Sequence, residues 1–170
     1  MTAKILDIPA HALVVLMGVA GSGKSTFARA HFRPTEILSS DSFRAMVSDD
    51  EGDQEATADA FTLLYCALEK RLQRGKVSVV DATNIHAEYR ARLLGYAQRF
   101  QRPVLAVILD TPERICVERA NNRRGRIVSP EVVQRQMAEL APQLADLSKE
   151  GFVKVFRFSP TDKVETRRSG

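Results

Sequence analysis

The chain has 170 residues, of which 44% are hydrophobic and 27% charged, and its formal net charge is +4. This length fits one domain with a substantial core, so we expect residues 1–170 to form a single unit. No apolar run approaches the ~20 residues needed to span a bilayer, which argues against a membrane protein. The first residues, MTAKILDIPAHA, have no signal-peptide layout, and we predict a cytoplasmic protein.

Five strand-like apolar runs alternate with helical patterns along the chain. The runs cover residues 12–17, 36–40, 77–81, 104–110 and 152–158. The helical patterns are a segment beginning at Lys24, a short helix at 42–47, and longer helices at 53–74, 86–100, 112–122 and 130–149. Strands that alternate with helices predict an α/β fold, in which helices cover both faces of a parallel sheet.

Charged residues and cysteines are unevenly placed. Residues 119–126 carry four arginines and no acid, whereas residues 41–59 carry seven acidic residues and one arginine. A local basic cluster of this kind indicates a polyanion contact, without naming nucleic acid. Cys66 and Cys116 lie among apolar residues with no CxxC or Cys/His pattern, and we expect both to be buried, reduced thiols.

The stretch from Gly18 to Ser25 reads GVAGSGKS. It fits G-x-x-x-x-G-K-[ST], the phosphate-binding loop of nucleotide-using enzymes, with a strand before it and a helix after it. We expect the loop amides to bind a polyphosphate, Lys24 to reach its β and γ phosphates, and the Ser25 hydroxyl to hold Mg²⁺. The predicted nucleotide-binding residues of this segment are Gly21, Ser22, Gly23, Lys24, Ser25 and Thr26.

The second strand ends in SSDSFR, at residues 39–44. Ligands of a parallel sheet bind at the carboxyl ends of its strands, so this segment should lie on the same rim as the phosphate loop. We predict that Asp41 accepts the proton of an alcohol during phosphoryl transfer. Arg44 shares a helical face with Asp41 and would bind an anionic group of the acceptor. The alternative is that Asp41 only caps the short helix at 42–47.

The third strand ends in DATN, at residues 81–84. Asp81 ends an apolar strand, as the aspartate of a nucleotide-binding site does when it binds Mg²⁺ through water. It could instead hold Arg44 in place, or only cap a turn. We expect Thr83 and Asn84 to shape the loop.

An arginine-rich segment separates the helices predicted at 112–122 and 130–149. Arg119 and Arg123 are four residues apart and therefore share a helical face. Two helices joined by an arginine-bearing loop predict a lid over about residues 112–132, whose arginines stabilise the transferring phosphate. The alternative is a solvated basic helix end, and Arg124 is expected to face solvent.

With these motifs in order, the chain closely resembles the kinase module of bacterial polynucleotide kinase-phosphatase, an RNA-repair enzyme. The matching pieces are GVAGSGKSTFA, LSSDSFR-x-x-x-SDDE-x-DQ, VVDATN and E-R-x-x-N-R-x-x-R, and they extend over about residues 13–158. The resemblance implies a P-loop fold like that of adenylate kinase, with a five-stranded parallel sheet and an arginine lid. It also implies transfer of the γ-phosphate of ATP or another NTP, with Mg²⁺ or Mn²⁺, to 5′-OH ends of RNA or DNA.

The same resemblance implies roles for single residues. Lys24 and Ser25 match the phosphate and metal residues of the family, and Asp41 matches its general base. Arg44 matches the arginine that contacts a phosphate of the acceptor.

Other implications concern the lid and the rest of the family's proteins. Arg119, Arg123 and Arg126 match the lid arginines. Val132, just inside the helix after the lid, would offer an apolar surface to the terminal base. Family members usually continue into phosphatase and nucleotidyltransferase modules, so we expect either a domain of a longer protein or a stand-alone kinase. The polar stretch 161–170 suits a domain boundary.

Three other functions share parts of this pattern. A P-loop kinase of a small-molecule alcohol, such as a sugar acid, has the same loop and often a base after the second strand. A nucleotide-binding switch needs no base at the position of Asp41, and a nucleic-acid-binding domain with a vestigial loop needs no intact Lys24. Arg44 and the basic lid favour an anionic acceptor over a neutral sugar.

Overall fold

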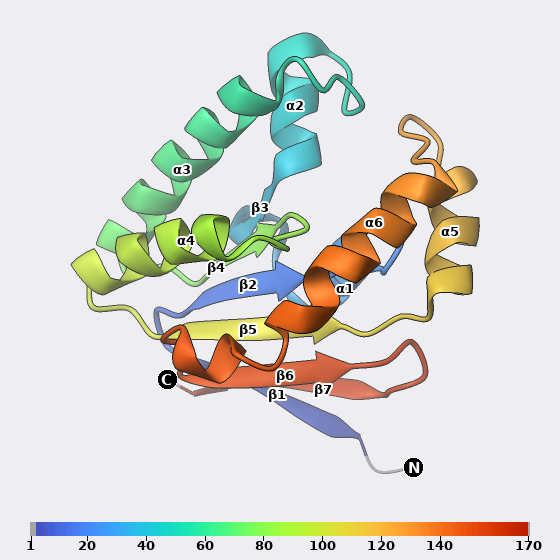
Figure 1. The fold of residues 1–170 in the computed structure, drawn as a ribbon. Helices are drawn as coiled ribbons and strands as arrows, with labels where there is room; N and C mark the ends of the chain where they lie inside the picture. The colour runs from blue at the N-terminus through green and yellow to red at the C-terminus, as the bar shows by residue number, and fades with distance from the viewer. Residues whose placement is uncertain (1–2, 170) are drawn as a thin grey trace.

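The computed structural model describes residues 3–169. The strands of its central sheet are β2 Leu13–Met17, β3 Ile37–Ser39, β4 Ser78–Asp81, β5 Val104–Leu109 and β6 Lys154–Phe158. They are all parallel and lie in the order β3-β4-β2-β5-β6 (Figure 1). Each strand falls within one of the five apolar runs, so the predicted α/β sheet is confirmed.

Strand β2 lies at the centre of the sheet and is buried along its whole length. Val15 pairs with Val80 of β4 on one side and with Ala106 of β5 on the other. A parallel strand that is covered on both faces is typically an unbroken apolar run. The parallel order also places the carboxyl ends of β2, β3 and β4 at one edge, where the predicted site residues follow.

Helices connect the strands and cover both faces of the sheet. Their bounds are α1 Lys24–His31, α2 Ser40–Ser48, α3 Thr57–Gln73, α4 Ala87–Arg99, α5 Glu113–Asn121 and α6 Pro130–Leu140. Successive side chains of a strand point to opposite faces. Leu13 and Val15 therefore pack in a hydrophobic cluster with α3, α4, α5 and α6, whereas Val14 and Leu16 pack in a second cluster with α1.

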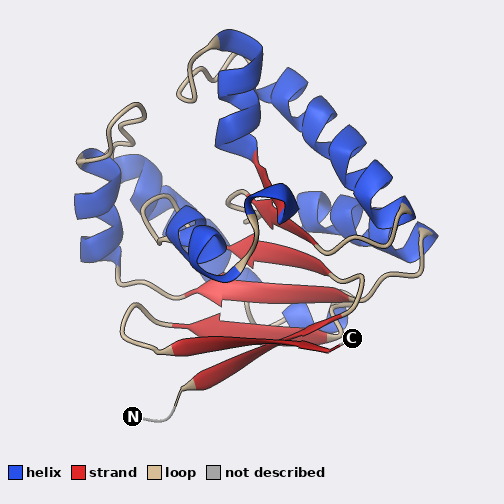
Figure 2. Cartoon of the chain, turned by 180° about the vertical axis from the view of Figure 1, so that it is seen from behind, coloured by secondary structure: helices blue, strands red, loops and turns tan. Residues whose placement is uncertain are grey.

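Two further strands, which the sequence analysis does not predict, pair with each other. β1 Lys4–Pro9 and β7 Val164–Ser169 form a separate two-stranded parallel sheet near the β6 edge (Figure 2). Leu6 and Ile8 of β1 join the hydrophobic cluster on the α1 face. Strand β7 is only partly buried at alternate positions, which is why its polar sequence resembles a tail. Residues 164–169 are therefore an integral part of this fold.

Two helices have boundaries that differ from the expected ones for local reasons. The helix expected over 130–149 ends at Leu140, because Pro142 lacks a backbone N–H and disfavours the helical conformation of the residue before it. Two short 3₁₀ turns, Ala141–Gln143 and Leu147–Lys149, follow it. The helix expected from 53 begins at Thr57, since the Asp53 carboxylate accepts a hydrogen bond from the Glu55 amide and forms a turn.

The two cysteines differ in exposure. Cys116 is buried as expected, but Cys66 is exposed, so the expectation of two buried thiols is wrong for Cys66. Cys66 lies on α3 next to Leu64 and Tyr65, whose side chains face the core. The Cys66 side chain lies on the solvent-facing side of the same helix. Among residues 3–169, no helix is both long and apolar enough to cross a membrane.

Candidate active site

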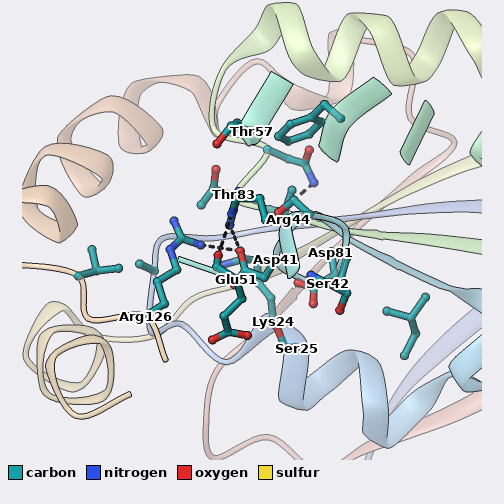
Figure 3. Close-up of a pocket in the computed structure, with 18 of the residues that line it drawn as sticks. Lys24, Ser25, Asp41, Ser42, Arg44, Glu51, Thr57, Asp81, Thr83 and Arg126 are labelled. Carbon is teal, nitrogen blue, oxygen red and sulfur yellow. Dashed lines mark hydrogen bonds and ion pairs between the residues drawn. The ribbon is translucent and has the colours of Figure 1, made fainter. Parts of the chain in front are cut away.

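A cleft of about 1590 Å³ lies at the carboxyl ends of β2, β3 and β4. The phosphate loop, α2, α3, α4 and the lid segment all contribute to its walls, and Figure 3 shows Lys24, Asp41, Arg44 and Arg126 pointing toward one another. The predicted site residues that line it are Gly21, Gly23, Lys24, Ser25, Thr26, Asp41, Arg44, Asp81, Arg119, Arg123 and Arg126. Ser22 is buried in the loop, and Val132 is half-buried on α6 outside this lining.

The phosphate loop is held in a shape that requires glycine. Gly21 has a φ of 76° and Gly23 a φ of 98°, in the left-handed region that other residues avoid. A Cβ atom at Gly21 would lie 2.1 Å from the backbone oxygen of Cys116 on α5. Because that oxygen belongs to a helix backbone, the loop could not accept even alanine there without moving α5.

Two side chains from other elements fix the loop backbone. The amide of Ala20 donates a 2.8 Å hydrogen bond to Oε1 of Gln136 on α6. The hydroxyl of Thr111 donates a 2.8 Å hydrogen bond to the carbonyl of Ser22. No motif in the sequence marks Gln136 or Thr111 as part of the site, because each bonds a backbone group that is far away in the chain.

Lys24 is the buried cation of the site. Its Nζ donates a 2.8 Å hydrogen bond to the carbonyl of Val19 and lies 3.4 Å from the Ser22 hydroxyl. Burial lowers the pKa of Lys24 to about 8, and the nearby carboxylates of Asp81 and Asp41 partly offset this shift. A desolvated ammonium group in a glycine-rich loop fits a polyphosphate, because it gains an anionic partner there.

Asp81 and Ser25 form the candidate metal site. Burial raises the pKa of Asp81, while a hydrogen bond with Ser25 and the charge of Lys24 lower it. A carboxylate and a hydroxyl are oxygen ligands of the kind that Mg²⁺ prefers, so this pair fits the implied metal. Arg44 makes its contacts with Asp41 and Glu51 within the described chain, which does not support the alternative that Asp81 holds Arg44.

Asp41 lies inside a helix and does not cap it. The helix begins at Ser40, two residues earlier than expected, and Ser39 is its N-cap. The Ser39 Oγ accepts a 3.3 Å hydrogen bond from the amide of Ser42, which is the usual N-cap contact. The capping alternative for Asp41 is therefore wrong, because Ser39 already performs that role.

Three arginines surround the carboxylate of Asp41. Its Oδ1 accepts from Arg44 and, at 2.5 Å, from Nη1 of Arg126. Its Oδ2 lies 2.8 Å from Nη2 of Arg123. Arg44 is only 3% exposed, and its Nε donates a 2.8 Å hydrogen bond to the carbonyl of Glu51. Burial lowers the pKa of Arg44, and Asp41 and Glu51 fix the direction of its guanidinium.

The arginine lid consists of α5, α6 and the loop between them, residues 122–129. Arg123 also pairs with Glu51 at 3.0 Å, and a Cβ atom at Gly52 would lie 3.1 Å from the carbonyl of Gly125. The lid tip thus contacts the acidic loop after α2. Arg119 of α5 lies next to the phosphate loop, where its Nη1 would be 3.5 Å from a Cβ atom at Gly23.

A buried polar network supports the loop after β4. Nδ2 of Asn84 donates a 2.7 Å hydrogen bond to the carbonyl of Leu16 in β2, which agrees with its expected role in shaping the loop. Arg90, which is fully buried, donates 3.1 Å and 2.6 Å hydrogen bonds to the Asn84 carbonyl and to Glu150. Arg90 was not among the predicted residues, although an arginine in line with Leu93 on the apolar face of a helix is a usable signal.

Comparisons with known proteins place this geometry in a family. A family model described as AAA domain (AAA_33) matches residues 13–143. No curated protein matches the chain.

Solved structures of similar fold include a chain of the Pnkp1/Rnl/Hen1 RNA repair complex. It has a TM-score of 0.69 and 20% identity, over 84% of this chain and 47% of that chain, so this chain spans about half of its length. A gluconokinase from Sinorhizobium meliloti 1021 has a TM-score of 0.56 and 22% identity, over 91% and 85% of the two chains. The APS kinase CysC of Mycobacterium tuberculosis has a TM-score of 0.54 and 19% identity, over 90% of each chain.

The TM-scores show that this chain shares its α/β fold with these structures, two of which are described as kinases. Because the family model covers most of the 170 residues, the chain belongs to this AAA domain family.

Proposed function

We propose that the protein transfers the γ-phosphate of ATP or another NTP to the 5′-OH end of RNA or DNA. The observation that carries this proposal is the pair formed by Asp41 and Arg44 beside the phosphate loop. A 5′-OH is followed along the strand by a phosphate on the 3′ side of the same nucleotide. A base next to a buried, fixed guanidinium suits an acceptor with these two groups close together.

The donor side supports nucleotide use. The phosphate loop amides and Lys24 would hold the polyphosphate, and Ser25 and Asp81 would hold Mg²⁺. When bound, the metal supplies positive charge that neutralises the phosphate oxygens. Arg119 beside Gly23 is positioned to add a guanidinium to the same phosphates.

The acceptor side supports proton removal by Asp41. As the acceptor oxygen forms its bond with the γ-phosphorus, the bond from that phosphorus to the leaving nucleoside diphosphate breaks. The hydroxyl proton passes to a carboxylate oxygen of Asp41 and later to water. Three arginines contact the Asp41 carboxylate, so an oxygen must be released first. We infer that Arg123 and Arg126 exchange Asp41 for phosphate oxygens as the substrates bind.

The test compares acceptors that differ only in the phosphate next to the ribose. Label transfer from γ-³²P ATP would be measured for a nucleoside and a nucleoside 3′-monophosphate, with wild type and Arg44→Ala. We expect kcat/KM for the nucleotide to exceed that for the nucleoside by roughly 10- to 100-fold, the range of a charge-assisted contact. Arg44→Ala should remove most of this difference, because it harms the phosphate-bearing acceptor most.

A matched control is Arg114→Ala, which removes an exposed arginine of α5 outside the cleft lining. It should leave the ratio unchanged. Equal use of the nucleoside and the nucleotide by wild type would contradict the polynucleotide assignment. A panel of sugar acids and other small alcohols in the same assay would then identify a small-molecule kinase.

A further inference from the structure

One wall of the cleft takes no part in phosphate transfer. It is formed by α3 and α4, and its residues Phe61, Tyr65, Tyr89 and Arg92 line the same cleft as Asp41. Tyr89 is 50% exposed, so a large part of its ring is open to a ligand. We call these four residues the aromatic shelf.

The shelf continues directly from the proposed acceptor site. One face of α3 carries three residues spaced four positions apart, Thr57, Phe61 and Tyr65. Thr57 lines the same cleft as Arg44 and Thr83 (Figure 3). The Thr57 Oγ1 is buried and has no hydrogen-bond partner within residues 3–169. An acceptor strand whose first phosphate is at Arg44 can thus continue along this face of α3.

The shelf combines a planar cation with stacked rings. The guanidinium of Arg92 lies 4.1 Å from the centre of the Tyr65 ring. Tyr65 in turn stacks on Tyr96 at 5.7 Å and packs against Phe61 at 5.8 Å. Arg92 is exposed and forms no ion pair within the described residues, unlike Arg99, about two turns further along α4, which pairs with Glu69 at 2.8 Å. The stack therefore fixes a guanidinium whose charge is not neutralised.

Exposed aromatic rings and unpaired arginines together are typical of single-stranded nucleic acid sites. A base of any identity can stack on an aromatic ring, and a guanidinium binds the backbone phosphate. Tyr89 and Arg92 are three residues apart on α4 and share a face, so one nucleotide can reach both. The other ligands of the cleft, a nucleoside triphosphate and the terminal nucleotide, are already accounted for by the phosphate loop, Asp41 and Arg44.

We propose that the aromatic shelf binds the second nucleotide of a single-stranded acceptor, with its base on Tyr89 and its 3′-side phosphate at Arg92. This inference rests on the proposed function and adds a second subsite to it. The shelf would contact the base by stacking and not through hydrogen bonds that distinguish one base from another. It would therefore favour longer acceptors without favouring a particular sequence.

The test compares a nucleoside 3′-monophosphate with a dinucleotide that carries a 3′-phosphate, since both supply the phosphate for Arg44. For wild type we expect kcat/KM to be about 10-fold higher for the dinucleotide, mainly through KM, as for one stacked base. Tyr89→Ala and Arg92→Gln should each bring the ratio of the two kcat/KM values close to one. Tyr89→Phe keeps the ring and should keep the ratio.

Arg99→Gln is the matched control, because it also removes an α4 arginine that lies over an aromatic ring, Phe100, at 5.3 Å, but outside the cleft lining. It should not alter the ratio. Equal use of both acceptors by wild type overturns the shelf and leaves the proposed function intact. Phosphorylation of neither acceptor overturns both.

Discussion

The phosphate loop and the exposed loop of the lid, residues 122–129, both line the cleft and are held in place by different forces. The loop is fixed by backbone geometry, as Gly21 in its left-handed conformation and the Ala20 amide bound to Gln136 show. The lid loop is exposed and is attached through Arg123 and Arg126 to Asp41 and Glu51. Ion pairs of partly exposed side chains are weak and screened by salt.

This difference indicates that the phosphate loop and the lid loop have different roles. A donor site built from backbone amides costs no reorganisation when a nucleotide binds. A lid held by charge pairs can exchange its carboxylate partners for phosphates and so close on the substrates. Mutations on the loop side should therefore remove chemistry, whereas mutations on the lid side should also change its mobility.

The largest effect is expected from Lys24→Ala on the loop side. In the proposed function Lys24 binds the phosphate charges, so its removal should abolish measurable label transfer from γ-³²P ATP. The fold should persist, because the buried ammonium pays a desolvation cost that alanine does not, and the melting temperature should not fall. Lys70→Ala, at an exposed position of α3, is the control. Near-normal turnover of folded Lys24→Ala at saturating ATP would contradict the phosphate-loop interpretation.

The next largest effect is expected from Asp41→Asn, which tests the acceptor side. Loss of general-base help should reduce kcat by about 10²- to 10⁴-fold, while ATP affinity changes little. Since Ser39 caps the helix, this loss cannot come from a missing cap. Asp59→Asn on the exposed surface of α3 should be fully active. Full activity of Asp41→Asn would show that Asp41 is not the base.

The Asp41→Asn variant also tests whether ion pairs hold the lid loop in place. Asp41→Asn removes the carboxylate that Arg123 and Arg126 contact, so trypsin should cleave the lid after these arginines faster than in wild type. High salt should have the same effect on wild type. Equal cleavage rates would indicate that the lid is held by packing and not by charge.

The smallest effect is expected on the affinity for ATP when the pH is raised. The pKa of Lys24 is lowered to about 8 in the ligand-free protein, so its charge is present below pH 8 and is lost above it. ATP prefers the charged form, and its affinity should fall by about 10-fold between pH 8 and pH 9.5. Fluorescent-nucleotide titrations would measure this fall. A Lys24→Arg variant, which stays charged over this range, should show a flat profile, and a flat wild-type profile would contradict the prediction.

Much of the central sheet could be predicted, because its signals are local. The five apolar runs all contain strands, and the signal is clearest for β2, β4 and β5, which are buried along almost their whole length. The motif from Gly18 to Ser25 likewise depends on adjacent residues. The β1–β7 pair was not predictable in the same way, because β7 is polar and forms only through its parallel pairing with a strand about 160 residues away.

The sequence by itself determined which chemical groups the site contains: a glycine loop with Lys24, carboxylates at 41 and 81, and a group of arginines. Only the tertiary structure decided which of these groups meet. It brought Arg123 and Arg126 onto Asp41 from 82 and 85 residues away, and Gln136 onto the phosphate loop. These contacts join elements that are far apart in the chain, because the parallel sheet sets the positions of the loop and α2, and helix packing places the lid helices against them.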